Sequence, residues 1–482
     1  MPNRDATYPA KGSPRSQWIA WRRYFTVFFF LGLAVAGNIS GAFAEELVLE
    51  KLVIEARKNN PEILALEARG AAARFKIPQA KSLPDPMVMA GYQNEGARYL
   101  YTFGTETDMG GSQWMFSASQ MFPYPGKLPL KAEMATRDAE TIEASAEALR
   151  LKIVSRVKEL YWDILLSHKN ISLIQDRIRL FAAVEDAAYA RYSTGMAPQQ
   201  ELLMAQTERY MLREKELMLR QKLQAFEAMM TGALGRKVNG ALGKPGAVTS
   251  SSFNQTIDEL VRLAHERSPE VKSREKMLAG AEAKVKMAQR EYYPDITVTA
   301  NYYARSSQFP DMWSVTTQVN IPIFYKTKQK ESVNEARASL TEAQRETEGI
   351  KLMITSAIRD NHSMILAADK LMELYKDGLI PKTERDFEAA LAGYRTGRVE
   401  AITVISRLKF LLEYETLYWG QYAEREKAIA RLESITADGL KSSVERSEKE
   451  TKLEEKESDN HIKLFDINYS ADTLFPGAQL FG

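Results

Sequence analysis

The residues best suited to bind a metal ion are methionines in the first half of the chain. Met109, Met115 and Met121 recur within a short stretch, and a thioether sulfur is a soft ligand that suits Cu(I) or Ag(I). Methionine at this density is typical of packing or of a loop. We therefore predict no metal site and no cofactor, with a copper or silver site as the alternative.

Histidine and cysteine offer no better metal site. The chain has no cysteine, and its four histidines are scattered singly: His168, His265, His362 and His461. A zinc site on a helix needs a histidine pair at i and i+4, usually completed by further His, Cys or carboxylate ligands. We predict that the histidines are solvated helix positions.

Catalytic groups do not fall together either. No nucleophile, base and orienting acid share a local motif, and the glycine-rich stretch 104–111 lacks the spacing of a phosphate loop. Lysine and arginine (65) nearly balance aspartate and glutamate (63), which gives no electrostatic footprint for nucleic acid. The sequence therefore predicts neither an enzyme nor a nucleic-acid-binding protein.

The N-terminus predicts export from the cytoplasm. Residues 24–37 are almost purely apolar, follow Arg22 and Arg23, and precede small residues that end at Ala44. An uncleaved anchor is the alternative, but about 14 apolar residues are fewer than the roughly 20 that span a bilayer. We predict a signal peptide over residues 1–44, and no lipid attachment because cysteine is absent.

The rest of the chain contains an internal duplication. Six residues recur in identical type and spacing: Leu52, Val53, Ala56, Pro61, Glu62 and Glu67 return as Leu260, Val261, Ala264, Pro269, Glu270 and Glu275. A fixed offset of this kind indicates two copies of one structural unit. We predict repeats over residues 45–240 and 257–437, a linker at the waist over 241–256, and a charged, flexible tail over 438–482.

Each repeat is predicted to contain a β-hairpin, over residues 86–122 and 295–322. In the second hairpin apolar and polar residues alternate along both strands. Val315 therefore falls on a face suited to lipid, and Thr316 on a face suited to water. After residue 44 no apolar run reaches the length of a transmembrane helix, so membrane insertion would require a β-barrel.

Each repeat also contains a long helical hairpin, over residues 128–235 and 327–435. The stretch 128–192 has no glycine, and as one helix it would reach roughly 100 Å. In the second repeat, Gly378 and Pro381 predict a kink. Helices this long need coiled-coil neighbours, which the returning helices would supply.

One chain cannot close a membrane barrel alone. It offers four predicted strands, whereas the smallest membrane barrels have about eight. Three copies would bring twelve strands together and close every edge. A helical tube of roughly 100 Å beneath them would be on the scale of a periplasmic space.

These features together resemble the TolC-like outer-membrane efflux protein family. The resemblance rests on the paired helix starts, on Pro84-Asp85 and Pro294-Asp295, and on the paired turns over residues 190–202 and 392–403. It implies a mainly α-helical duct with a transmembrane β-barrel: a duplicated protomer that gives four strands to a trimeric barrel and long helices to a periplasmic α-barrel. Residues 82–86 and 122–127 resemble the heavy-metal-cation branch that includes CusC and CzcC.

The family resemblance also assigns roles to the two helical turns. It implies that the turns are periplasmic tips that dock an adaptor, with these residues: Tyr192, Thr194, Gly195, Tyr394, Thr396 and Gly397. It places a gate at four positions: Glu201, Tyr394, Thr403 and Ser406. Where TolC has aspartates at its constriction, Thr403 and Ser406 stand here, and of the gate carboxylates only Glu201 remains. The alternative is a turn with a purely structural role.

The resemblance implies the outer-membrane channel of a tripartite efflux system in a Gram-negative bacterium. Such a homotrimer, held in outer-membrane lipid, would receive substrates, heavy-metal cations among them, from an RND-type pump or an ABC exporter through a periplasmic adaptor. A type I secretion outlet and a periplasmic coiled-coil scaffold are the alternatives. The alternating strand ending near Ile321 favours the channel.

Overall fold

The computed structural model describes residues 47–93, 113–236, 242–246, 251–305 and 309–437. The predicted signal peptide, Met109, residues 104–111, His461 and the predicted tail lie outside these ranges. The chain divides into two compact units. In the small one, Met1–Leu47 with Ala241–Lys244, the backbone N–H of Leu47 donates to the carbonyl of Lys244 at 3.0 Å. The large unit comprises Val48–Gly240 and Pro245–Gly482.

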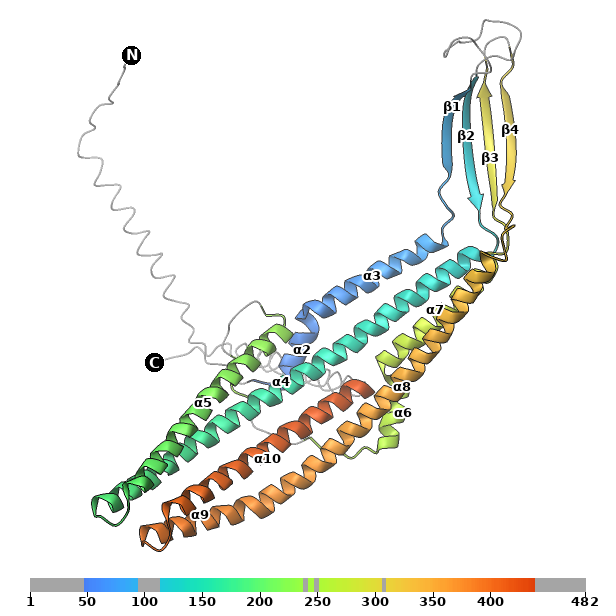
Figure 1. The fold of residues 1–482 in the computed structure, drawn as a ribbon. Coiled ribbons are helices and arrows are strands. Elements are labelled where there is room, and N and C mark those ends of the chain that lie inside the picture. Colours follow the sequence, from blue (N-terminus) through green and yellow to red (C-terminus); the bar gives the residue numbers. More distant parts are fainter. Residues whose placement is uncertain (1–46, 94–112, 237–241, 247–250, 306–308, 438–482) are drawn as a thin grey trace, which may run out of the picture. The chain divides into compact units, whose positions relative to one another are not determined.

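The two halves of the large unit have the same order of elements (Figure 1). The first half contains α2 (Leu49–Asn59), α3 (Pro61–Lys81), β1 (Met87–Gln93), β2 (Gln113–Phe122), α4 (Lys127–Ser193) and α5 (Gln199–Ala233). The second contains α6 (Ile257–Arg267), α7 (Pro269–Arg290), β3 (Ile296–Ala304), β4 (Met312–Val319), α8 (Gln329–Glu373), the π-helical turn η1 (Leu374–Leu379), α9 (Ile380–Arg395) and α10 (Ala401–Thr436).

A proline begins the second helix of each half. Pro61 opens α3 and Pro269 opens α7, where the missing backbone N–H costs nothing because the first turn has no intrahelical acceptor for it. The side chain of Asn60 accepts from the backbone N–H of Glu62 at 2.9 Å and donates to the carbonyl of Ala233 at 2.9 Å. This one side chain therefore caps α3 and ties it to the end of α5.

The long helices form largely as predicted. α4 runs for 67 residues without a break, which corresponds to roughly 100 Å. In the second half, α8 gives way to η1, which contains Gly378, and α9 follows with Pro381 in its first turn. The predicted irregularity is confirmed at these two residues, because proline cannot continue the regular hydrogen-bond ladder. Gly349 and Gly393 lie inside regular helix.

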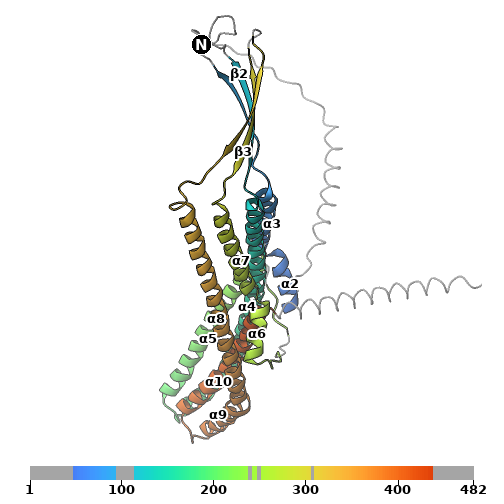
Figure 2. The same cartoon turned by 90° about the vertical axis from the view of Figure 1, so that its right-hand side faces the viewer.

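The four strands make one antiparallel sheet in the order β1-β2-β3-β4 (Figure 1), with β2 and β3 paired in its middle (Figure 2). The strands coincide with the predicted ones, except that β1 is described to Gln93 and β4 ends at Val319 rather than Ile321. Their register places Val315 opposite Ala300, and Thr316 opposite Thr299.

The register gives the sheet one apolar and one polar face. The apolar face carries Val88, Ala90, Tyr92, Trp114, Phe116, Ala118, Gln120, Phe122, Ile296, Val298, Ala300, Tyr302, Ala304, Trp313, Val315, Thr317 and Val319. The polar face carries serine, threonine, asparagine and glutamine together with methionines, and hydrogen bonds such as Asn301 Nδ2 to Ser314 Oγ (3.2 Å) cross it. The two-fold alternation seen in the sequence is thus a property of the whole sheet.

The helices pack around α4, which contacts α2, α3, α5, α7 and α10. One apolar core lies where the two helical hairpins meet, and it includes Phe181, Phe387, Tyr394 and Leu408. A second core joins α6 and α7 to α8 and α10 around Ile358. Within the described residues, none of the helices combines the length and the apolar composition needed to cross a membrane.

Candidate functional site

The two helical hairpins reverse direction through turns of the same construction. In the first, the N–H of Met196 donates to the carbonyl of Arg191 at 2.8 Å, and Gly195 has φ +71°. In the second, the N–H of Arg398 donates to the carbonyl of Gly393 at 2.9 Å, and Gly397 has φ +75°. Glycine is needed because this left-handed backbone is strained for other residues.

The threonine of each turn satisfies carbonyl groups at the helix end. Thr194 Oγ1 donates to the carbonyl of Ala190 at 3.1 Å, and Thr396 Oγ1 donates to that of Gly393 at 3.0 Å. The last carbonyls of a helix otherwise lack partners. The Tyr-x-Thr-Gly pattern therefore has a structural explanation in both repeats.

The tyrosines of the two turns differ sharply. Tyr192 is 42% exposed, whereas Tyr394 is fully buried. The hydroxyl of Tyr394 donates to the Glu201 carboxylate at 2.9 Å, and this bond crosses from the second helical hairpin to the first. Tyr394 and Glu201, two of the four predicted gate residues, therefore meet across the hairpins.

Arg191 completes this contact, which we call the tip latch (Arg191, Glu201 and Tyr394). Its guanidinium lies 4.6 Å from the centre of the Tyr394 ring and donates to the Tyr394 carbonyl at 2.6 Å. It also donates to the carbonyl of Met196 at 3.3 Å. Sequence reasoning missed Arg191, and the only signal was a basic residue in the last turn of a helix.

Burial, followed by the hydrogen bond with the Glu201 carboxylate, raises the pKa of Tyr394 to about 12. Both effects disfavour the tyrosinate, and the nearby Arg191 offsets them only in part. The phenol of Tyr394 therefore stays protonated at physiological pH and remains a hydrogen-bond donor.

The other two predicted gate residues stand apart from the tip latch. Thr403 and Ser406 are half-buried positions near the start of α10. Ser406 Oγ donates to the carbonyl of Ile402 at 2.8 Å, within its own helix. Of the predicted gate residues, Tyr394 and Glu201 therefore share a hydrogen bond between hairpins, whereas the hydrogen bond of Ser406 stays within α10.

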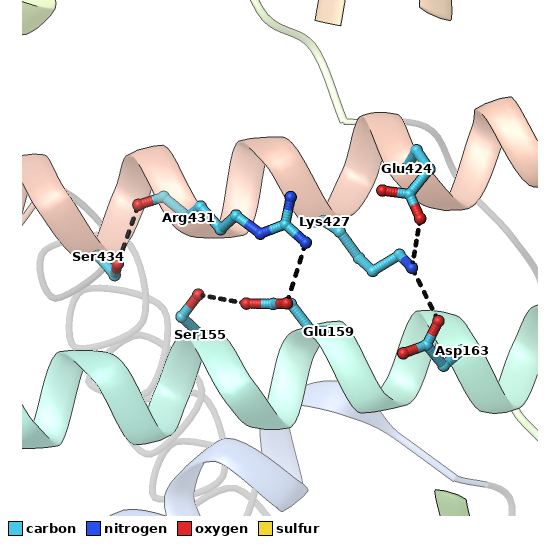
Figure 3. Close-up of polar contacts among 7 residues, drawn as sticks. All are labelled: Ser155, Glu159, Asp163, Glu424, Lys427, Arg431 and Ser434. Atoms are coloured by element: carbon cyan, nitrogen blue, oxygen red, sulfur yellow. Dashed lines mark hydrogen bonds and ion pairs between the residues drawn. The ribbon is translucent and has the colours of Figure 1, made fainter. Parts of the chain in front are cut away.

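Away from the tips, α4 and α10 are held together by a row of ion pairs (Figure 3). Lys427 Nζ contacts Asp163 at 2.8 Å and Glu424 at 2.6 Å, while Arg431 contacts Glu159 at 3.1 Å. Further ion pairs on the same two helices join Lys158 to Glu433 and Arg177 to Glu415. The row links the long helix of the first half to the last helix of the second.

Lys427 shows that this row is stable in the charged form. Burial lowers the pKa of Lys427, but the hydrogen bonds with Asp163 and Glu424 outweigh that effect and raise the pKa above its ordinary value. The ammonium is therefore kept charged. Because the ion pairs are partly buried, salt screens them less than it screens surface pairs.

The proline-rich stretch before α4 and the Pro294-Asp295 pair meet at the junction between sheet and helices. Lys127 is only 3% exposed, and its ammonium donates to Asp295 Oδ1 at 2.9 Å and to the carbonyl of Tyr293 at 3.0 Å. The same Asp295 oxygen accepts from the backbone N–H of Tyr124 at 2.7 Å, and the Tyr124 and Tyr293 rings stack at 4.4 Å. Tyr124 and Lys127, which belong to the stretch that resembles the metal-cation branch, thus have a structural role.

The histidine prediction needs correction at all three described positions, because His168, His265 and His362 are half-buried. His265 is half-buried, and its Nε2 lies 3.2 Å from Thr355 Oγ1. His362 is also half-buried, with its ring 5.8 Å from that of Phe253. Both residues face neighbouring elements, which single-helix periodicity does not reveal. In the part of the chain that the structure describes, no group of three His, Cys, Asp or Glu could hold a metal ion.

Comparison with known proteins agrees with this architecture. The model of the outer membrane efflux protein family matches residues 52–236 and 260–405. The pyoverdine export outer membrane protein OpmQ of Pseudomonas putida is 22% identical over 407 residues, which cover 81% of this chain and 84% of that protein. The cobalt-zinc-cadmium resistance protein CzcC of Cupriavidus metallidurans is 21% identical over 64% of this chain and 73% of that protein.

Solved structures show the same fold. Crystal structures of CusC match with a TM-score of 0.71 and 17% identity, covering 82% of this chain and 93% of that chain. The outer membrane protein VceC of Vibrio cholerae matches with a TM-score of 0.69 and 17% identity, covering 80% of this chain and 95% of that chain.

The chain belongs to the outer membrane efflux protein family. The predicted fold class is confirmed: a mainly helical, internally duplicated channel protomer whose strands contribute to a barrel. The protein is accordingly an outer-membrane efflux channel and not an enzyme.

Proposed function

We propose that this chain forms the homotrimeric outer-membrane duct of a tripartite efflux system. The observation that carries the proposal is the two-faced sheet, which has an apolar face for lipid, a polar face for a lumen, and two edges, β1 and β4, that have no strand partner within one chain's described residues. An unpaired sheet edge is energetically prohibitive in lipid, because its backbone N–H and C=O groups have no hydrogen-bond partners there. Three copies of the four strands would close a twelve-stranded barrel.

The helices support the same assembly. On α5, Leu203, Tyr210 and Leu217 are 51%, 61% and 68% exposed, and they follow one another at seven-residue spacing. A heptad of large apolar residues is the pattern of a coiled-coil seam. We assign this seam to a neighbouring copy of the chain, which would extend the helices into a periplasmic tube.

The two turns would be the docking surface for a periplasmic adaptor. In the first, Tyr192 and Met196 are 42% and 72% exposed, and Thr194 and Gly195 set the turn. In the second, Thr396 and Gly397 do the same, while the buried Tyr394 can act only by fixing the position of the turn.

The gate, in this proposal, is closed by the tip latch. Tyr394 and Glu201 lie on different hairpins, so an outward movement of one hairpin would break their bond. Thr403 and Ser406, further along α10, would line the passage. Adaptor binding would favour the open arrangement by contacting it more extensively than the closed one.

Substrate and pump are assigned by similarity of the chain to named relatives. CzcC is a cobalt-zinc-cadmium resistance protein, and CusC of Escherichia coli is a cation efflux system protein. We propose heavy-metal cations as substrate and an RND-type inner-membrane pump as partner. We also propose that the signal peptide over residues 1–44 exports the protein, and that the protein carries no lipid because the sequence contains no cysteine. Residues 45–240 and 257–437 are, in this proposal, the two repeats.

Reconstitution into planar lipid bilayers tests the channel directly. Purified protein should insert and give discrete, cation-conducting steps of uniform size, because a closed barrel has one lumen. A preparation that is folded by circular dichroism and inserted in lipid, yet gives no steps under any adaptor condition, would overturn the proposal.

A further inference from the structure

The methionines of the sheet all lie on its polar face. The strands contain five: Met87 and Met89 on β1, Met115 and Met121 on β2, and Met312 on β4. The strand register places every one of them on the polar face, opposite the face that carries Phe116, Trp313 and Val315. This placement is unusual, because methionine is apolar and the apolar face was available.

Four of these methionines form a continuous zigzag along β1 and β2. Met87 pairs with Ser119, next to Met121 on the same face, and Met89 pairs with Ser117, next to Met115. Met87 and Met89 are themselves successive on their face. Diagonal neighbours of this kind are within reach of long side chains. We call this set the methionine ladder (Met87, Met89, Met115 and Met121).

The strand positions around the ladder leave room for its sulfur atoms. Met115 pairs with Gly91, and a Cβ added to that glycine would lie 3.4 Å from Met115 Cε. The end of the Met115 side chain therefore lies over β1 at Gly91. At the other neighbour of Met115, Tyr303 pairs with Met312, which adds a fifth thioether at the same level.

Packing does not explain the ladder. Met87 and Met89 are 66% and 52% exposed, and their partners Ser119 and Ser117 are small and polar. In a closed barrel with the apolar face towards lipid, this face borders the lumen, which a barrel of this size does not fill with side chains. The four thioethers would then line the water-filled path.

Thioether sulfur selects soft cations. It carries no charge and binds hard ions poorly, whereas Cu(I) and Ag(I) prefer it. Conduction requires several neighbouring sites that bind weakly enough to release the ion, and a row of neutral ligands satisfies this requirement. We propose that the methionine ladder is a series of transient coordination sites along which soft monovalent cations cross the barrel. The proposal rests on the proposed channel function and names its substrate class.

Ag(I) in chloride-free buffer is a suitable probe because it needs no reductant. The test compares potassium currents through the original channel with those through a variant carrying Met87→Leu, Met89→Leu, Met115→Leu and Met121→Leu, which keeps apolar volume. Ag(I) passing along the ladder should reduce the original current reversibly. In the variant the half-blocking concentration should rise at least about tenfold, as expected when metal ligands are removed.

A matched control replaces four exposed methionines of the helical part: Met211, Met218, Met229 and Met353. This control should keep the original Ag(I) block, and Zn(II) should act equally on all three channels. Equal Ag(I) block in the ladder variant and the original would overturn the proposal. A channel that conducts potassium without Ag(I) block would also overturn it while leaving the channel function intact, whereas no current at all would reject the channel function itself.

Should the ladder variant fail to assemble, binding can be measured without conduction. Equilibrium dialysis of the detergent-solubilised original trimer with Ag(I), followed by sulfur-edge X-ray absorption, should show thioether coordination that single Met89→Leu weakens. Silver bound only through nitrogen or oxygen ligands would contradict the proposal.

Discussion

Breaking the tip latch should open the channel without harming its assembly. Tyr394→Phe removes the hydroxyl that donates to Glu201 at 2.9 Å, and Glu201→Gln removes the charge that strengthens this bond. A hydrogen bond to a charged group contributes about 1.5–3 kcal/mol. Because Glu201 is only half-buried and regains water when the latch breaks, the lower end applies, about 1.5 kcal/mol per chain.

Symmetry multiplies this small energy. If the three latches of a trimer open together, their loss totals about 4.5 kcal/mol, which raises the ratio of open to closed channels about 2,000-fold. A channel that is almost always closed would then be open for a measurable fraction of the time. Single-channel recording in planar bilayers should show longer open events, and cells should become sensitive to large antibiotics.

Tyr192→Phe is the matched control for this experiment. Tyr192 occupies the same position in the first turn but is 42% exposed, and its hydroxyl has no hydrogen-bond partner among the described residues. It should leave gating unchanged. An open probability in the double variant equal to that of this control, with trimers intact, would refute the assignment of the gate to Tyr394 and Glu201.

Three further predictions concern the barrel, the junction and the pH dependence of the latch. Val315→Arg should reduce trimer yield in membranes far more than Thr316→Arg, because a charge facing lipid near mid-bilayer costs about 2–4 kcal/mol; equal yields would refute our assignment of the faces. Lys127→Met should lower the free energy of unfolding by about 3 kcal/mol, since it leaves Asp295 without its buried partner, and adding Asp295→Asn should recover part of the loss in denaturant titrations. The raised pKa of Tyr394 means that the latch contributes its full stability below pH 10.0, and that this stability is lost as the pH rises towards about 12. The difference in tyrosinate absorbance between the original protein and Tyr394→Phe should show this late titration. A titration of Tyr394 near its ordinary pKa would contradict the prediction.

Much of the fold follows from local patterns in the sequence. The repeated segments that begin near Leu52 and Leu260 indicate the order of elements in the two halves, and two-residue alternation predicts the strands. The break near Gly378 followed from backbone chemistry alone. These features depend on residues close together in the chain, where propensity and periodicity are informative.

The candidate site was less predictable because it depends on packing between hairpins. Tyr192 and Tyr394 stand in nearly identical local sequences, yet only Tyr394 is buried against the other hairpin. Arg191 gave no distinctive signal, since its partners on the other hairpin are a ring and a carbonyl more than 200 residues away. The burial of His265 against α8 was missed for the same reason.

We propose that three copies of this chain form one channel in the outer membrane. Native mass spectrometry of the protein extracted from a purified outer-membrane fraction measures this most directly. We predict a single species of three mature chains, which resists mild heating in detergent because the barrel edges are closed between chains. A monomer recovered from the periplasmic extract, with none in the membrane fraction, would contradict the trimeric outer-membrane channel.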